Sequence, residues 1–93
     1  YKLALQLPDG TQVELFSFPN PAARPSYPEA CGLRHLALRV ADMQTSVAAL
    51  AAHGVAVEPV RTDPLTGALF TFFADPDGLP IELVGPAASA TPH

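Results

Sequence analysis

The sequence predicts an α+β fold: one complete βαβββ module, preceded by the last two strands of another such module. The main observation is a repeat, because segment 8–15 returns as segment 76–83 at an offset of 68, with five of eight positions identical. Each copy joins a Pro-Asp-Gly turn to a short strand that carries one glutamate. Alternating apolar residues in several segments and a single segment with helical spacing complete the pattern. Internal repetition indicates duplicated units, so it decides the architecture.

The first part of the chain is typical of a β-hairpin. Leucines alternate with other residues over 2–7, which predicts a strand, and a Pro-Asp-Gly turn leads into a returning strand over 12–18. Four prolines then occur within residues 19–28. Because proline lacks a backbone donor and has a restricted φ, this stretch is predicted to be an extended connector.

The second part contains the helix and four strands. Asp42 is a good N-cap for the predicted helix. Gly54 is placed to end the helix, because helices often terminate in a glycine with left-handed backbone conformation. One predicted strand precedes this helix and three follow it. Turns rich in Asp, Pro and Gly precede the last two of these strands. The predicted strands are 33–40, 55–60, 69–73 and 81–84.

We therefore divide the chain into four segments. Residues 1–18 are the C-terminal hairpin of an incomplete first module, and 19–31 are the Pro-rich connector. Residues 32–85 are the complete second module, and 86–93 are a flexible tail. The repeat offset leads us to expect that the beginning of the first module lies upstream of residue 1.

Composition excludes several classes of protein. Hydrophobic residues make up 48% and charged residues 15% of the chain, as in globular domains. The net charge is −4, with five scattered Lys and Arg, so a nucleic-acid surface is not expected. No apolar run approaches the roughly 20 residues of a membrane span. A single cysteine, Cys31, predicts a reducing, cytoplasmic setting, and we expect it to be a buried structural thiol.

Two glutamates and one histidine are the candidate site. Strand alternation places Glu14, His35 and Glu82 on the face of their strands opposite the apolar face. A lone Glu or His is most often structural or solvated, but a glutamate retained through a duplication favours a site. Two carboxylates and an imidazole are ligands suited to Ni²⁺, Zn²⁺, Co²⁺, Mn²⁺ or Fe²⁺. By the offset, a second histidine would lie before residue 1.

Three segments carry a resemblance to a known family: Gly-Leu-Arg-His-Leu-Ala-Leu at 32–38, the helix after Asp42, and Phe-Thr-Phe-Phe-Ala-Asp-Pro-Asp-Gly-Leu-Pro-Ile-Glu-Leu at 70–83. Together they resemble the vicinal oxygen chelate superfamily, which includes glyoxalase I, fosfomycin-resistance proteins and extradiol dioxygenases. The resemblance spans about residues 1–84 and is strongest to small bacterial glyoxalase-like proteins. It implies paired βαβββ modules around a metal site, with Glu14, His35 and Glu82 as ligands.

The resemblance also implies a function. It indicates a metal-dependent lyase or isomerase similar to glyoxalase I, acting on a small substrate with vicinal oxygens. Glu82 and its repeat counterpart Glu14 would be the catalytic carboxylates, and a homodimer is expected. The arginines at 34, 39 and 61 are candidates for holding an anionic substrate. The alternatives are a metal-dependent dioxygenase of the same superfamily and a non-catalytic small-molecule-binding or resistance protein.

Overall fold

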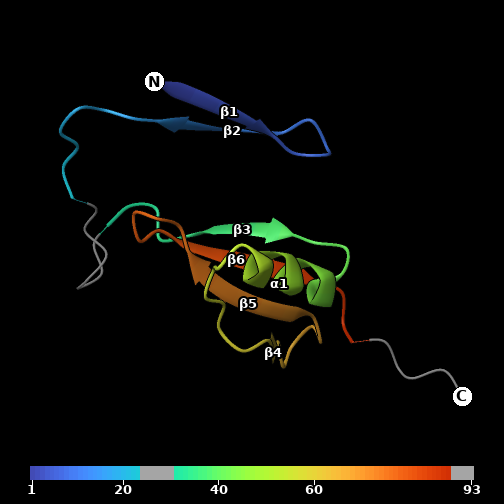
Figure 1. Cartoon of the computed structure of the whole chain (residues 1–93). Helices are drawn as coiled ribbons and strands as arrows, with labels where there is room; N and C mark the ends of the chain where they lie inside the picture. The colour runs from blue at the N-terminus through green and yellow to red at the C-terminus, as the bar shows by residue number, and fades with distance from the viewer. Residues whose placement is uncertain (24–30, 89–93) are drawn as a thin grey trace, which may run out of the picture.

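The α+β fold predicted from the sequence is confirmed in a computed structural model, which describes residues 1–23 and 31–88. A two-stranded antiparallel sheet comes first, and a four-stranded mixed sheet with strand order β3-β6-β5-β4 follows, with one helix packed on β6 (Figure 1). The elements are β1 (Lys2–Gln6), β2 (Gln12–Phe16), β3 (Leu36–Arg39), α1 (Met43–Ala52), β4 (Arg61–Thr62), β5 (Leu69–Ala74) and β6 (Pro80–Gly85).

Strand β6 lies inside the larger sheet, parallel to β3 and antiparallel to β5. Its residues alternate regularly, because Ile81, Leu83 and Gly85 are buried while the residues between them are half-buried. The buried residues face α1, whose first residue, Met43, is also buried. The opposite face of β6 carries Glu82. The core is thus on the helix side, and the candidate site is on the other face.

Helix α1 begins and ends where its sequence predicts. Asp42 has an extended backbone, and its Oδ1 accepts hydrogen bonds from the N–H groups of Gln44 (3.0 Å) and Thr45 (3.4 Å). These bonds satisfy amides that have no partner inside the helix. At the other end Gly54 has a φ of +77°, the left-handed conformation that terminates many helices.

The two copies of the repeat have the same backbone geometry. The N–H of Leu7 donates to the carbonyl of Thr11 (2.7 Å), and at the offset of 68 the N–H of Asp75 donates to the carbonyl of Leu79 (2.9 Å). The glycines of the two turns, at 10 and 78, have φ values of +90° and +89°, which favour glycine. The strand registers also coincide, since Ala4 opposes Glu14 as Phe72 opposes Glu82.

Two strand predictions were wrong in their bounds. The segment 55–60 does not form a strand. Its backbone bond to β5 runs from the N–H of Glu58 to the carbonyl of Phe72 (3.0 Å), and strand β4 begins at Arg61. Pro59 precedes it and has no N–H to donate to a ladder, which explains the interruption. Strand β3 is also shorter than predicted, so His35 lies immediately before it.

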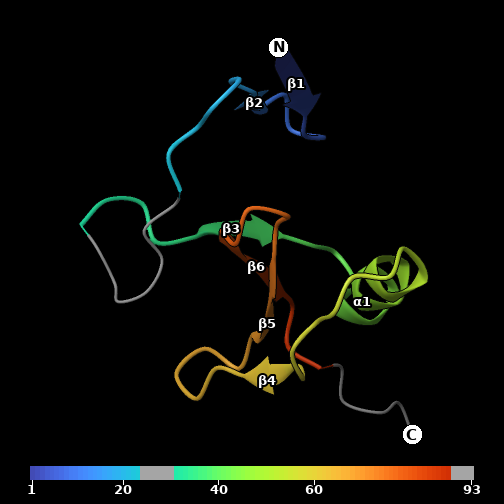
Figure 2. The same cartoon turned by 60° about the vertical axis from the view of Figure 1, so that its left-hand side comes forward.

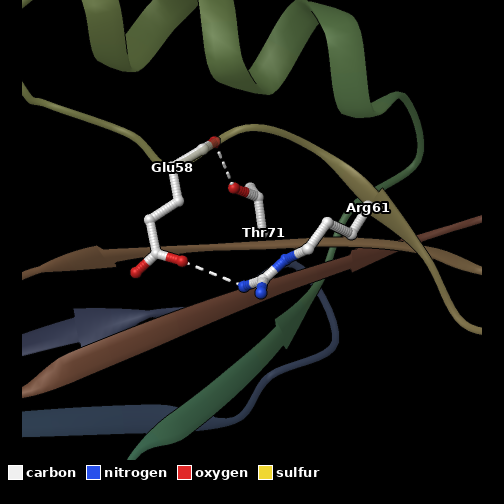
Figure 3. A network of polar contacts seen from close by, with 3 residues as sticks. All are labelled: Glu58, Arg61 and Thr71. Atoms are coloured by element: carbon white, nitrogen blue, oxygen red, sulfur yellow. Dashed lines mark hydrogen bonds and ion pairs between the residues drawn. The ribbon is translucent and has the colours of Figure 1, made fainter.

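A polar network attaches the segment before β4 to strand β5. Thr71 is fully buried, and its hydroxyl donates to the carbonyl of Glu58 at 2.6 Å. The carboxylate of Glu58 accepts a hydrogen bond from Arg61 at 2.9 Å. Figure 3 shows both contacts, one at the backbone and one at the side chain of Glu58. The guanidinium of Arg61 also lies 5.1 Å from the centre of the Phe70 ring.

The β1–β2 hairpin lies beyond the β3 edge of the larger sheet in both views (Figures 1 and 2). Much of its apolar surface is exposed, as in Leu3, Leu5 and Leu15. The connector and tail predicted at 19–31 and 86–93 lie in part outside the described residues. Cys31 is exposed, so its expected burial was wrong; it precedes β3 in an irregular segment away from the core. Within the described residues, no helix has the length and apolar character needed to cross a membrane.

The cap of α1 gives a test of this fold. Asp42→Ala should lower the free energy of unfolding by about 1 kcal/mol, because it removes the acceptor for two helix amides. Asp42→Ser should retain most of the stability, since serine caps helices almost as well. Urea denaturation of both variants measures the difference, and equal stability of the alanine and wild-type proteins would contradict the capping role.

Candidate metal centre

The candidate site is centred on His35 and Glu82. The Nε2 atom of His35 lies 3.1 Å from Oε1 of Glu82, at hydrogen-bond distance. The side chains are 33% and 20% exposed, so both are sheltered but still reachable from solvent. His35 lies immediately before β3 and Glu82 lies in β6, and the two residues are 47 positions apart in the sequence. The parallel pairing of β3 with β6 is what brings them together.

A row of residues on the open face of the sheet surrounds this pair. In the register, Ala37 and Phe72 flank Glu82 on the neighbouring strands β3 and β5. The Phe72 ring stands edge-on to the imidazole of His35, with centroids 5.3 Å apart. Phe70 in turn meets Phe72 edge-to-face at 6.4 Å. An alanine thus leaves space on one side of Glu82, while aromatic rings form an apolar wall on the other.

The role of Phe72 was not assigned from the sequence. Alternation predicts that Phe70 and Phe72 share a face, but it leaves open whether that face is the core or the site. The sequence repeat could have predicted which face Phe72 occupies. The first hairpin pairs Ala4 with Glu14, and the offset of 68 transfers this pairing to Phe72 and Glu82.

Glu14 does not join the other two predicted ligands in this structure. Its Oε2 atom lies 3.0 Å from Nζ of Lys2, and both side chains are exposed. In the part of the chain that the structure describes, no group of three or more His, Cys, Asp or Glu side chains lies close enough to hold a metal ion. The structure therefore brings His35 and Glu82 together and leaves Glu14 apart, and the three-ligand site stays a prediction.

The surroundings of the two glutamates explain this difference. Strand β6 has a neighbour on each side, so Glu82 is flanked by β3, near His35, and by β5. Strand β2 pairs only with β1 in the described residues. The cross-strand neighbour of Glu14 is Ala4, which fills less space than Phe72. Glu14 is therefore exposed to solvent, whereas Glu82, on the equivalent face of its strand, is partly covered by its neighbours.

The pair of donors has a spacing that suits a shared metal ion. Nitrogen and oxygen ligands bind divalent metals such as Zn²⁺ at about 2.1 Å, so two neighbouring ligands lie about 3.0 Å apart at right angles and about 3.4 Å apart in a tetrahedron. The 3.1 Å between His35 and Glu82 lies within this range. Imidazole and carboxylate also suit the borderline divalent metals. The residues present fit two positions of such a site.

His53 is accounted for by the helix. Its Nδ1 lies 2.8 Å from the carbonyl of Ala49, which it can satisfy by donating a proton. The residue is the C-cap of α1, where a terminal carbonyl needs a partner. This agrees with a structural role rather than a place in the site.

Comparison with known proteins identifies the class of protein to which this fold corresponds. A sequence model of the Glyoxalase/Bleomycin resistance protein/Dioxygenase superfamily matches residues 2–83. The chain therefore belongs to this superfamily, as its motifs predicted.

The chain is also similar to individual proteins, one of which is a solved glyoxalase family structure. The chain is 55% identical over 83 residues to YwkD of Bacillus subtilis (strain 168), covering 89% of this chain and 65% of YwkD. It is 62% identical over 71 residues to YaeR of Escherichia coli (strain K12), covering 76% of this chain and 55% of YaeR. A solved glyoxalase family protein from Enterococcus faecalis has a TM-score of 0.79 and 49% identity, over 89% of this chain and 65% of that one. The chain thus spans less than two thirds of each.

A double-mutant cycle tests whether His35 and Glu82 interact in the folded protein. We expect His35→Ala and Glu82→Ala to show a coupling of about 0.5–1 kcal/mol in the free energy of unfolding, because the two side chains are near each other and only partly exposed. Denaturant titration of the two single variants and the double variant gives this value. Purely additive effects would show that the pair makes no net contribution to stability.

Proposed function

We propose that the chain contributes a half-site to a metal-dependent lyase or isomerase of the glyoxalase I type. The observation that carries the proposal is the pairing of His35 with Glu82 on the open sheet face, at the spacing of two adjacent metal ligands. Superfamily membership supports metal chemistry of this kind but does not select one reaction, because the family name itself spans three activities.

In this proposal His35 and Glu82 would hold a divalent cation, for which an imidazole nitrogen and a carboxylate oxygen are suitable ligands. The cation would act as a Lewis acid toward two vicinal oxygens of a small substrate. A carboxylate next to the reacting carbon serves as general base, taking a proton from one carbon and returning it to its neighbour. Glu82 is placed for this task because its side chain faces the open side of the sheet beside His35.

The aromatic wall would control the surroundings of the reaction. Phe72 lies beside both members of the pair, and Phe70 extends the apolar surface. Apolar walls exclude water, which strengthens electrostatic interactions within a site. Phe72 also limits the orientations open to the His35 ring, so we assign it a positioning role.

Glu14 enters the proposal as the counterpart of Glu82. The two residues occupy the same position in hairpins of identical register. We propose that in the whole protein Glu14 completes the ligand set, exchanging its contact with Lys2 for the metal. The Lys2 ion pair is exposed, and pairs of this kind contribute about 0–1 kcal/mol, so breaking it costs little.

Activity and metal content of the full-length protein test the proposal. With Ni²⁺ or Zn²⁺ added, the protein should convert the methylglyoxal–glutathione adduct, and Glu82→Gln should lower kcat by about 10²- to 10⁴-fold because it removes the base. The control is Glu58→Gln, which removes a carboxylate that pairs with Arg61 and does not contact His35 or Glu82.

The outcomes separate the alternatives. Lack of turnover by metal-loaded protein would exclude the lyase, and oxygen-dependent cleavage of a catechol would identify a dioxygenase instead. Unchanged metal content in a Glu14→Ala/Glu82→Ala double variant would exclude the metal site. Absence of metal together with a ligand in the cavity would identify a binding or resistance protein.

A further inference from the structure

The row of residues next to Glu82 on the open face contains two arginines. Arg39 follows Ala37 by two residues on β3, so its side chain leaves the sheet on the same face. The register then runs from Arg39 to Val84, from Val84 to Phe70, and from Phe70 to Arg61. Adjacent rows on one face are about 7 Å apart, since each residue advances a strand by about 3.3 Å.

The two arginines differ in the hydrogen-bond and ion-pair partners of their guanidinium groups. Arg61 donates to the carboxylate of Glu58 at 2.9 Å and lies over the Phe70 ring, so its charge is compensated locally. Arg39 is exposed, and no hydrogen bond or ion pair joins its side chain to another residue within the ranges 1–23 and 31–88. Of the two, Arg39 is therefore the cation with its donors available for a ligand.

Arg39 also lines a groove. A space of about 870 Å³ lies between the turn of the first hairpin and the ends of β3 and β6, within the size range of ligand pockets. Figure 1 shows this turn above the C-terminal end of β3. The groove reaches Ala37, the direct neighbour of Glu82 in the register, although neither His35 nor Glu82 lines it. Its residues include Leu7, Pro8, Asp9, Ala37, Arg39 and Val84.

The groove contains one opposing charge. Asp9 lines its far wall and is the only acidic residue among the lining residues, as Arg39 is the only basic one. The backbone N–H of Thr11 donates to Asp9 at 2.9 Å, and this bond is the main cause of a lowered pKa for the carboxyl group. Asp9 is therefore ionised at neutral pH and opposes the entry of an anion.

We propose that Arg39 forms an oxyanion-binding subsite, which selects substrates that carry a carboxylate or phosphate group one row along the sheet from the vicinal oxygens. This inference rests on the proposed function for the position of the vicinal oxygens. The guanidinium presents paired N–H donors that match either oxyanion. Val84 and Phe70, which continue the row, offer apolar surface to the carbon chain.

The first experiment needs no metal. Binding of inorganic phosphate to the metal-free full-length protein is measured by calorimetry for the wild type and three variants. Arg39→Gln should weaken binding at least about tenfold, as expected for losing a charge-assisted hydrogen bond. Asp9→Asn should strengthen it about two- to fivefold, since the amide keeps the acceptor for Thr11 and loses the charge.

The matched control is Arg61→Gln. It removes the same charge from the same row, but that guanidinium is already paired with Glu58, so phosphate affinity should change less than twofold. Thermal denaturation of each variant checks that it is folded. An equal loss of phosphate affinity in the two arginine variants would show that only net charge matters, and it would overturn the assignment of the subsite to Arg39.

The second experiment joins the subsite to the metal centre. The affinity of metal-loaded protein for 2-oxoglutarate is compared with its affinity for 2-oxopentanoate, which has the same carbon chain and vicinal oxygens but no distal carboxylate. The wild type should bind 2-oxoglutarate at least about tenfold more tightly, and Arg39→Gln should abolish this difference in affinity. Preference for 2-oxoglutarate with weak phosphate binding identifies a carboxylate subsite, and strong phosphate competition identifies a phosphate subsite.

The two proposals fail in different ways. Phosphate binding could depend on Arg39 while the affinity of the protein for both 2-oxo acids is the same with and without metal. In that case the metal proposal fails and the subsite remains. If metal binds through His35 and Glu82 but no anion depends on Arg39 in either experiment, the subsite is overturned.

Discussion

The alternation of residues along β6 is the constraint on which the rest of the structure depends. A strand inside a sheet presents successive side chains to opposite faces. Ile81, Leu83 and Gly85 therefore form the surface against α1, and Glu82 must face away from it. A register shift by one residue would bury the carboxylate under the helix and expose the core residues. The same few residues hold the fold together and orient the candidate ligand.

The two hairpins show how much a site depends on its neighbours. Their turns, glycine conformations and registers agree at an offset of 68, so local sequence is sufficient to reproduce this geometry. The glutamates nevertheless differ in environment. Glu82 has a strand on either side and contacts His35, whereas Glu14 is exposed and forms an ion pair with Lys2. Burial and partners, rather than the local motif, distinguish a candidate ligand from a surface carboxylate.

The open face of the larger sheet combines three kinds of chemistry in adjacent rows. His35 and Glu82 offer nitrogen and oxygen donors, Phe70 and Phe72 offer apolar surface, and Arg39 offers a positive charge. Ligand sites are typically mostly apolar with a few polar groups placed to fix orientation. Strand pairing fixes the spacing between these rows, and in the proposed site this spacing would select small substrates by the separation of their functional groups.

The sequence by itself determined the α+β class, the duplicated hairpin and the helix between Asp42 and Gly54, because turns, caps and alternation are local properties. It also predicted the ligands of a metal site, and that prediction remains to be tested. It mispredicted strand 55–60, where Pro59 interrupts the ladder, and the burial of Cys31. Only the tertiary structure decided that Phe72 stands against His35, and that Glu14 lies apart from Glu82. It also decided that Arg61 is paired with Glu58, while Arg39 has no such partner among the residues that the structure describes. These are contacts between segments distant in the chain, and they follow from strand order and register, which local pattern does not specify.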